Sequence, residues 1–122
     1  MAVAEKTKEK VIVITDLKSS LKEFARAYER ASRGEEVERD TIGVSNPKEL
    51  QTLLSPKRLE LLRAIKEHKP RSIKELAGLV KRDVRNVHRD LVILEAVGLV
   101  ELEKKGKEVK PIVDYDEIVI RI

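Results

Sequence analysis

Residues 72–98 decide the fold, and they read SIKELAGLVKRDVRNVHRDLVILEAVG. Ser72 is a good N-terminal cap, and the segment after it carries apolar residues at helical spacing: Ile73, Leu76, Ala77 and Val80. After the turn Lys81-Arg82-Asp83, Asp83 caps a longer helix to about Val97, with a second apolar stripe: Val84, Val87, Leu91 and Leu94. Gly98 ends that helix. A short helix, a tight turn and a longer helix predict a helix-turn-helix.

The flanking sequence extends this motif on both sides. Ser55-Pro56 is a helix start, and the helix runs to about Lys69 with apolar residues on one side: Leu59, Leu62 and Ile65, with Leu61 beside them. Downstream we expect strands at Leu99–Glu103 and Val109–Val113, joined by the turn Lys104–Lys107. The predicted fold is α+β and mainly helical, with a winged helix-turn-helix domain over residues 55–113.

The remaining segments are expected to form extensions of that domain. We expect a flexible tail at 1–10, a strand–helix extension over 11–54 and a C-terminal strand within 114–122. The extension should hold a strand at Val11–Ile14, a helix over Leu17–Ala31, a second short strand at 42–44 and a helix start at Asn46-Pro47. The last strand should lie at Ile118–Ile122. Three roles remain open for these elements: they could pack on the winged helix, form a subunit interface or bind a protein partner.

Composition excludes several classes of site and of protein. The chain has no cysteine, which rules out disulfides and thiolate metal sites. His68 and His88 are the only histidines and are not expected to form a metal site. No apolar run approaches the ~20 residues of a membrane span. We therefore expect a cytoplasmic protein without catalytic residues, metal or cofactor. Charged residues make up 39% of the chain, which resembles thermophile composition.

The positive charge is concentrated in one segment. Residues 56–110 hold fifteen basic and nine acidic residues, whereas residues 1–55 are balanced. A basic module suits a polyanion, although a lysine-rich solvated surface would look the same. Aromatic residues are scarce, which argues against stacking on single-stranded nucleic acid.

Candidate base-reading residues cluster at the start of the longer helix. A helical projection places Arg82, Arg85 and Arg89 opposite the apolar stripe, with Asn86 at the edge of that face. Arginine pairs with guanine and asparagine with adenine through two-pronged hydrogen bonds in the major groove. We therefore predict base readout by these four residues, the alternative being an ordinary solvated helix face.

Candidate phosphate contacts surround this face. Lys104, Lys105 and Lys107 lie at the predicted wing tip, where ammonium groups would meet phosphates without reading sequence. Ser72 and His88 are further candidates for phosphate contacts. The alternatives are a solubilising hairpin and, for His88, a packed histidine at the border of the buried face.

Three stretches carry a family resemblance: SIKELA at 72–77, RDVRNVHRDL at 82–91 and LEAVGLV at 94–100. They resemble archaeal and bacterial winged-helix transcriptional regulators, broadly of the MarR and ArsR kind. The resemblance extends to the N-terminal strand–helix and to the closing Tyr115-Asp116-Glu117-Ile118. The sequence departs from many such motifs in lacking a glycine in the turn.

These observations predict a sequence-specific regulator of transcription that binds double-stranded DNA. The recognition helix would be 83–97 and the wing 100–113. A homodimer is expected, because one recognition helix reads too few base pairs to discriminate within a genome. The alternative is an antitoxin-like module that binds a toxin-like protein partner and also regulates its own operon.

Overall fold

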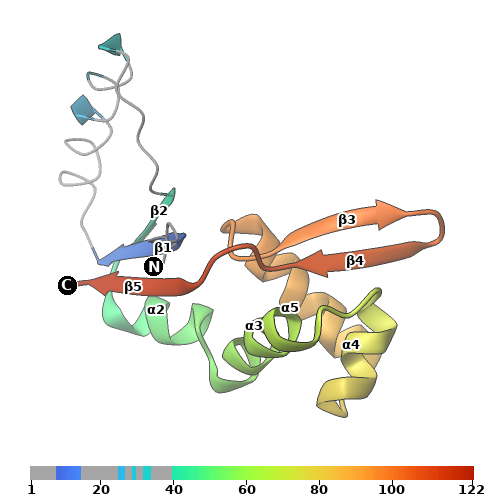
Figure 1. Ribbon diagram of the computed structural model, residues 1–122. Coiled ribbons are helices and arrows are strands. Elements are labelled where there is room, and N and C mark those ends of the chain that lie inside the picture. The colour runs from blue at the N-terminus through green and yellow to red at the C-terminus, as the bar shows by residue number, and fades with distance from the viewer. Residues whose placement is uncertain (1–7, 15–24, 27–28, 30–31, 34–39) are drawn as a thin grey trace, which may run out of the picture. The chain divides into compact units, whose positions relative to one another are not determined.

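The computed structural model describes residues 8–14, 25–26, 29, 32–33 and 40–122. The chain divides into two compact units (Figure 1). Residues 1–50 and 115–122 form the sheet unit, and residues 51–114 form the helical unit. The described residues hold four helices, a parallel three-stranded sheet and a β-hairpin, so the fold is α+β as expected.

The sheet unit contains β1 (Glu9–Ile14), β2 (Asp40–Val44) and β5 (Glu117–Arg121). The strand order is β2-β1-β5, and β1 runs parallel to both neighbours. Val11 and Ile12 are consecutive on the central strand and therefore point to opposite faces, yet they are only 1% and 0% exposed. Both faces of the sheet are thus covered at its centre, as is usual for parallel sheets.

The register of the sheet groups its most apolar side chains on one face. Ile12 pairs with Ile42 and Ile120, and Ile14 pairs with Val44. β-branched residues favour strands because their stiff side chains pack well on a pleated surface. The predicted strands at 11–14, 42–44 and 118–122 are therefore all present, and β1 extends back to Glu9, which the sequence had placed in a flexible tail.

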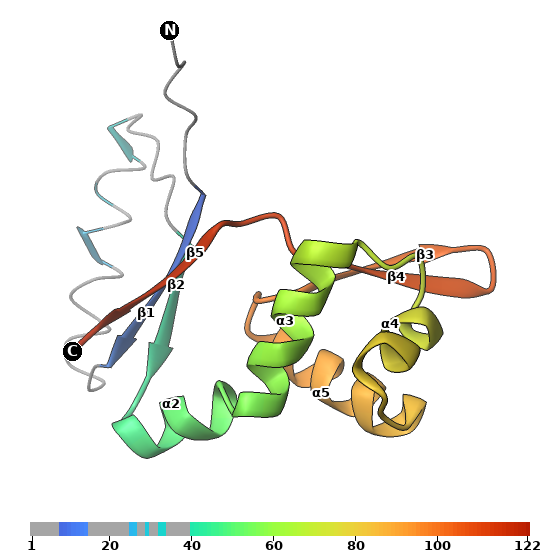
Figure 2. The same cartoon turned by 60° about the horizontal axis from the view of Figure 1, so that its bottom comes forward.

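The helical unit contains α3 (Pro56–His68), α4 (Ile73–Val80), α5 (Val84–Ala96), β3 (Glu101–Lys105) and β4 (Glu108–Ile112). The three helices contact one another, and α3 and α4 also contact β4. Figures 1 and 2 both show the β3–β4 hairpin projecting past these helices. The core draws apolar residues from each helix and from the segment after α5: Leu61, Leu62, Ile65, Ile73, Leu76, Ala77, Val87, Leu91, Leu94, Leu99 and Val100.

The helix starts follow the capping residues that the sequence predicts. Ser55, Ser72 and Asp83 cap α3, α4 and α5, and each side chain accepts a hydrogen bond from a backbone N–H of the first turn. The start of α2 (Pro47–Leu53) is built in the same way, because Asn46 Oδ1 accepts from Glu49 N at 2.9 Å. These predicted starts are confirmed.

Three expectations about packing and strand position are wrong. Leu59 is 43% exposed and Val84 is 44% exposed, so neither belongs to the core. The first hairpin strand begins at Glu101 and not at Leu99. Leu99 N donates to Leu94 O at 2.9 Å and Gly98 N donates to Glu95 O, which closes the end of α5 before the strand starts.

Two further findings concern segments outside this core. The predicted helix over Leu17–Ala31 lies mostly outside the described residues. The described residues in and next to this range include four that are helical: Ala25, Arg26, Glu29 and Ser32. Within the described part of the chain, no helix is both long and apolar enough to span a membrane.

Candidate nucleic-acid interface

The turn between α4 and α5 has a defined geometry without glycine. Lys81 adopts the left-handed conformation with φ of 54°, and Arg82 N donates to Ala77 O at 3.0 Å. Asp83 then caps α5, with its Oδ1 accepting from Arg85 N at 2.8 Å. A lysine thus occupies the backbone conformation that a glycine usually supplies at a helix end.

A half-buried ion-pair cluster fixes this turn to two helices. Asp90 of α5 accepts from Arg82 Nη2 at 2.8 Å and from Arg58 Nε at 3.2 Å. The three side chains are only 15–18% exposed. Arg58 lies on α3 and also donates to Thr52 O, so the cluster joins α3, the turn and α5. Charge-assisted hydrogen bonds shielded from water are stronger than surface ones, and here they set the relative position of three elements.

The cluster changes the expected position of Arg82. The helical projection placed Arg82 with Arg85 and Arg89 on one exposed face. Arg82 instead turns inward to Asp90, and its Nη1 is buried with no acceptor among the described residues. The structure therefore does not bring Arg82 together with the other predicted base readers, because Arg82 forms an ion pair with Asp90.

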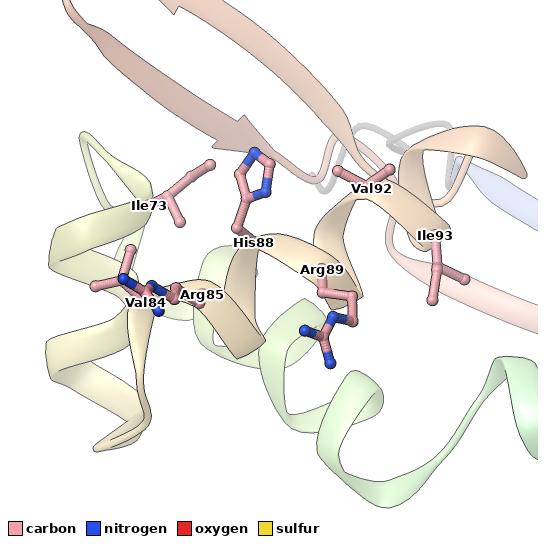
Figure 3. A pocket seen from close by; sticks show the side chains of 7 residues that line it. All are labelled: Ile73, Val84, Arg85, His88, Arg89, Val92 and Ile93. Atoms are coloured by element: carbon pink, nitrogen blue, oxygen red, sulfur yellow. The ribbon is translucent and has the colours of Figure 1, made fainter.

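The remaining predicted readers lie on the exposed side of α5. Arg85, Asn86, His88 and Arg89 are all exposed. Arg85, His88 and Arg89 line an open groove (Figure 3) together with four apolar residues: Ile73, Val84, Val92 and Ile93. His88 was expected at the border of the buried face, but it belongs to this exposed surface.

The apolar half of this groove was not predicted from the sequence. In the sequence, the residues of this groove on α5 form two series spaced four residues apart: Val84, His88 and Val92, and Arg85, Arg89 and Ile93. Residues four apart lie one above the other on a helix, so the two rows form one face. Apolar and basic side chains therefore alternate along a single exposed surface of α5, opposite the buried Val87 and Leu91.

Ser72 lies at the start of α4 and is half-buried. Its Oγ accepts from Glu75 N at 3.1 Å, which leaves the hydroxyl hydrogen able to donate to another group. The described residues include no group of three or more His, Asp or Glu side chains placed to hold a metal ion.

The lysines of the β3–β4 hairpin differ in whether a carboxylate lies near them. Lys105 lies opposite Glu108 in the ladder and is 3.6 Å from Glu103, so its charge is locally compensated. Lys104 lies opposite Val109, and Lys107 lies in the connection Gly106-Lys107. Neither has an ion-pair partner among the described residues. Gly106 takes a φ of 63° in this two-residue connection, as a type II′ turn requires of its first central residue.

The electrostatic balance of the two units differs. The helical unit holds fifteen basic and ten acidic residues, so its formal net charge is +5. The rest of the chain is close to neutral. The exposed face of α5 and the hairpin tip therefore belong to the positive part of the molecule.

Comparison with known proteins identifies the family. The family model HVO_A0114 matches residues 53–120, which is more than half of the chain and includes α3, α4, α5 and the hairpin. No curated protein matches the chain with significance. The chain therefore belongs to the HVO_A0114 family.

Proposed function

We propose that the chain is a sequence-specific regulator of transcription that binds double-stranded DNA through a winged helix-turn-helix. In this proposal α4 and α5 are the two helices of the motif, α5 is the recognition helix and the β3–β4 hairpin is the wing. The observation that carries the proposal is the exposed face of α5, where Arg85, Asn86 and Arg89 project from the N-terminal half of a helix that follows a tight turn.

The proposed base readers have chemistry that fits the major groove. This groove admits one α-helix, and guanine presents two acceptors there that match an arginine fork. Arg85 and Arg89 are assigned to guanine, and Asn86 to adenine. Arg82 does not read bases in this scheme, because it holds the turn in place through Asp90.

The proposed phosphate contacts lie around the recognition helix. Ser72 can donate its hydroxyl hydrogen to a phosphate, and His88 is exposed beside the arginines. On the wing, Lys104 and Lys107 are the leading phosphate contacts, with Lys105 weakened by its neighbouring carboxylates. Such contacts fix the position of the protein on the duplex without reading sequence.

Fluorescence anisotropy with labelled random-sequence duplexes tests the proposal. The wild-type chain should bind duplexes in preference to single strands of the same sequences, and its affinity should fall steeply with salt. Arg85→Ala and Arg89→Ala should each weaken binding. Arg63→Ala removes the same charge from an exposed position on α3, where Arg63 pairs with Glu67, and serves as the matched control.

Three outcomes separate the possibilities. Weak binding by Arg85→Ala and Arg89→Ala, with wild-type binding by Arg63→Ala, supports the proposed face. Equal losses in all three variants would mean that only net charge matters. Absence of duplex binding at low salt would refute the proposed function.

A further inference from the structure

Val84 stands out on the proposed recognition helix. It is the first residue of α5, it is 44% exposed, and it lines the groove beside Arg85 (Figure 3). The periodicity of α5 predicts that Val84 packs against the core on the same stripe as Val87 and Leu91. Val87 and Leu91 are buried, but Val84 is not. The apolar side chain of Val84 is therefore presented to whatever approaches the start of α5.

The first turn of α5 also presents a basic side chain beside Val84. Asp83 caps the helix, and its Oδ1 accepts from Arg85 N at 2.8 Å. The Arg85 side chain is exposed and lines the groove together with Val84. A partner that fits both residues accepts hydrogen bonds from an arginine and offers an apolar group beside the acceptors.

We infer that Val84 contacts the C5 methyl group of a thymine adjacent to the guanine contacted by Arg85. This inference rests on the proposed function. Among the base edges in the major groove, the thymine methyl is the apolar group, and guanine offers the two acceptors that arginine prefers. Neighbouring residues at the start of the helix would thus read neighbouring bases, one by burial of a methyl group and one by hydrogen bonds.

A second exposed valine provides a matched control. Val92 is 45% exposed and lines the same groove two helical turns further along α5. Eight residues of helix span about 12 Å. Since recognition helices contact bases mainly with their N-terminal residues, Val92 lies beyond the bases that Val84 and Arg85 reach.

The test compares thymidine with deoxyuridine, which pairs identically and lacks only the methyl group. The probe is the duplex most enriched by the wild-type chain from a random pool, synthesised with either nucleoside. Burial of one methyl group contributes about 0.8 kcal/mol, so the wild type should bind the deoxyuridine duplex about fourfold more weakly for each methyl contacted. Val84→Ala should discriminate between the two duplexes less than the wild type does, and Val92→Ala should discriminate as the wild type does.

The outcomes distinguish this inference from the function on which it rests. Equal binding of both duplexes by the wild type would overturn the inference and leave DNA binding intact. Retained discrimination by Val84→Ala, or its loss in Val92→Ala, would also overturn it. Failure of the wild type to bind or enrich any duplex would overturn the proposed function as well, and would point to a protein partner for the groove.

Discussion

Lys81 ends α4 in the left-handed conformation, with φ of 54°. This conformation costs a residue with a Cβ atom about 1–2 kcal/mol, and glycine avoids most of that cost. We predict that Lys81→Gly raises the free energy of unfolding by about 0.5–1 kcal/mol, after the larger entropy of glycine in the unfolded chain is subtracted. Urea unfolding followed by circular dichroism measures the change.

The control for this substitution is a lysine with the same side chain in a helical backbone. Lys74 is exposed within α4, so Lys74→Gly should lower stability by about 1 kcal/mol. A loss of stability in both variants would contradict the conformation described for the turn.

Asp90 should be the most sensitive polar residue of the helical unit. Asp90→Ala leaves Arg58 and Arg82 half-buried without their counter-charge, and we expect a loss of about 2–4 kcal/mol in the free energy of unfolding. Glu67→Ala breaks another arginine–carboxylate pair, Arg63–Glu67 at 3.0 Å, but that pair is exposed and should contribute about 0.2–0.5 kcal/mol. Similar effects of the two substitutions in urea titrations would show that the cluster does not hold the turn.

Short-range signals account for the residues that the sequence placed correctly. Ser55, Ser72 and Asp83 act through backbone groups two or three residues away, so their capping roles are readable along the chain. Arg82 was misplaced because its partner Asp90 lies eight positions away and is shared with Arg58, which precedes Arg82 by 24 positions. Charge pairing at that range depends on how the helices pack, which helical periodicity does not contain.

At the scale of elements, the hairpin should contribute affinity through a subset of its lysines. Lys104→Gln and Lys107→Gln should each reduce the slope of log affinity against log salt by about 0.9, the value for one phosphate contact. Lys105→Gln should change the slope less, because Glu103 and Glu108 already compensate Lys105. Binding of cognate and scrambled duplexes over a salt series measures the three slopes.

The ranking of sequences should be the same in all three hairpin variants, since lysines on phosphates carry no sequence information. An altered ranking would indicate that the wing reads bases in the minor groove. Unchanged slopes in all three would place the hairpin tip away from DNA.

The elements themselves were largely predictable, and their exact limits less so. Helix starts and the Gly98 terminus follow from capping chemistry. Leu99 and Val100 were expected in a strand because Val100 and Leu102 alternate with polar residues. Instead, Leu99 closes the end of α5 through its backbone N–H, and both side chains enter the core. Lys104 and Lys105 were expected in the turn, but they extend β3 by pairing with Val109 and Glu108 of β4.

At the scale of the whole molecule, the sheet unit joins distant parts of the chain. β1 and β5 were each predicted as strands, but not their parallel pairing, which sets Glu9 against Glu117. Strand register depends on contacts made only after folding, so sequence periodicity predicts the strands and not their neighbours.

We expect the chain to act on DNA as a homodimer. Two recognition helices about one helical turn of DNA apart would read a site with two-fold symmetry and supply the discrimination that one helix lacks. Sedimentation equilibrium of the free protein and of its complex with an enriched duplex should give two chains in each. Monomers in both would contradict this expectation.

The most direct test of the central claim is selection from a random duplex pool by the wild type, Arg85→Ala and the control Arg63→Ala. The wild type and Arg63→Ala should enrich one motif that contains guanine. Arg85→Ala should keep its thermal stability and lose about 1–3 kcal/mol of discrimination at one guanine position. Enrichment of the same motif with the same affinity by folded Arg85→Ala would contradict the claim that the exposed face of α5 reads DNA.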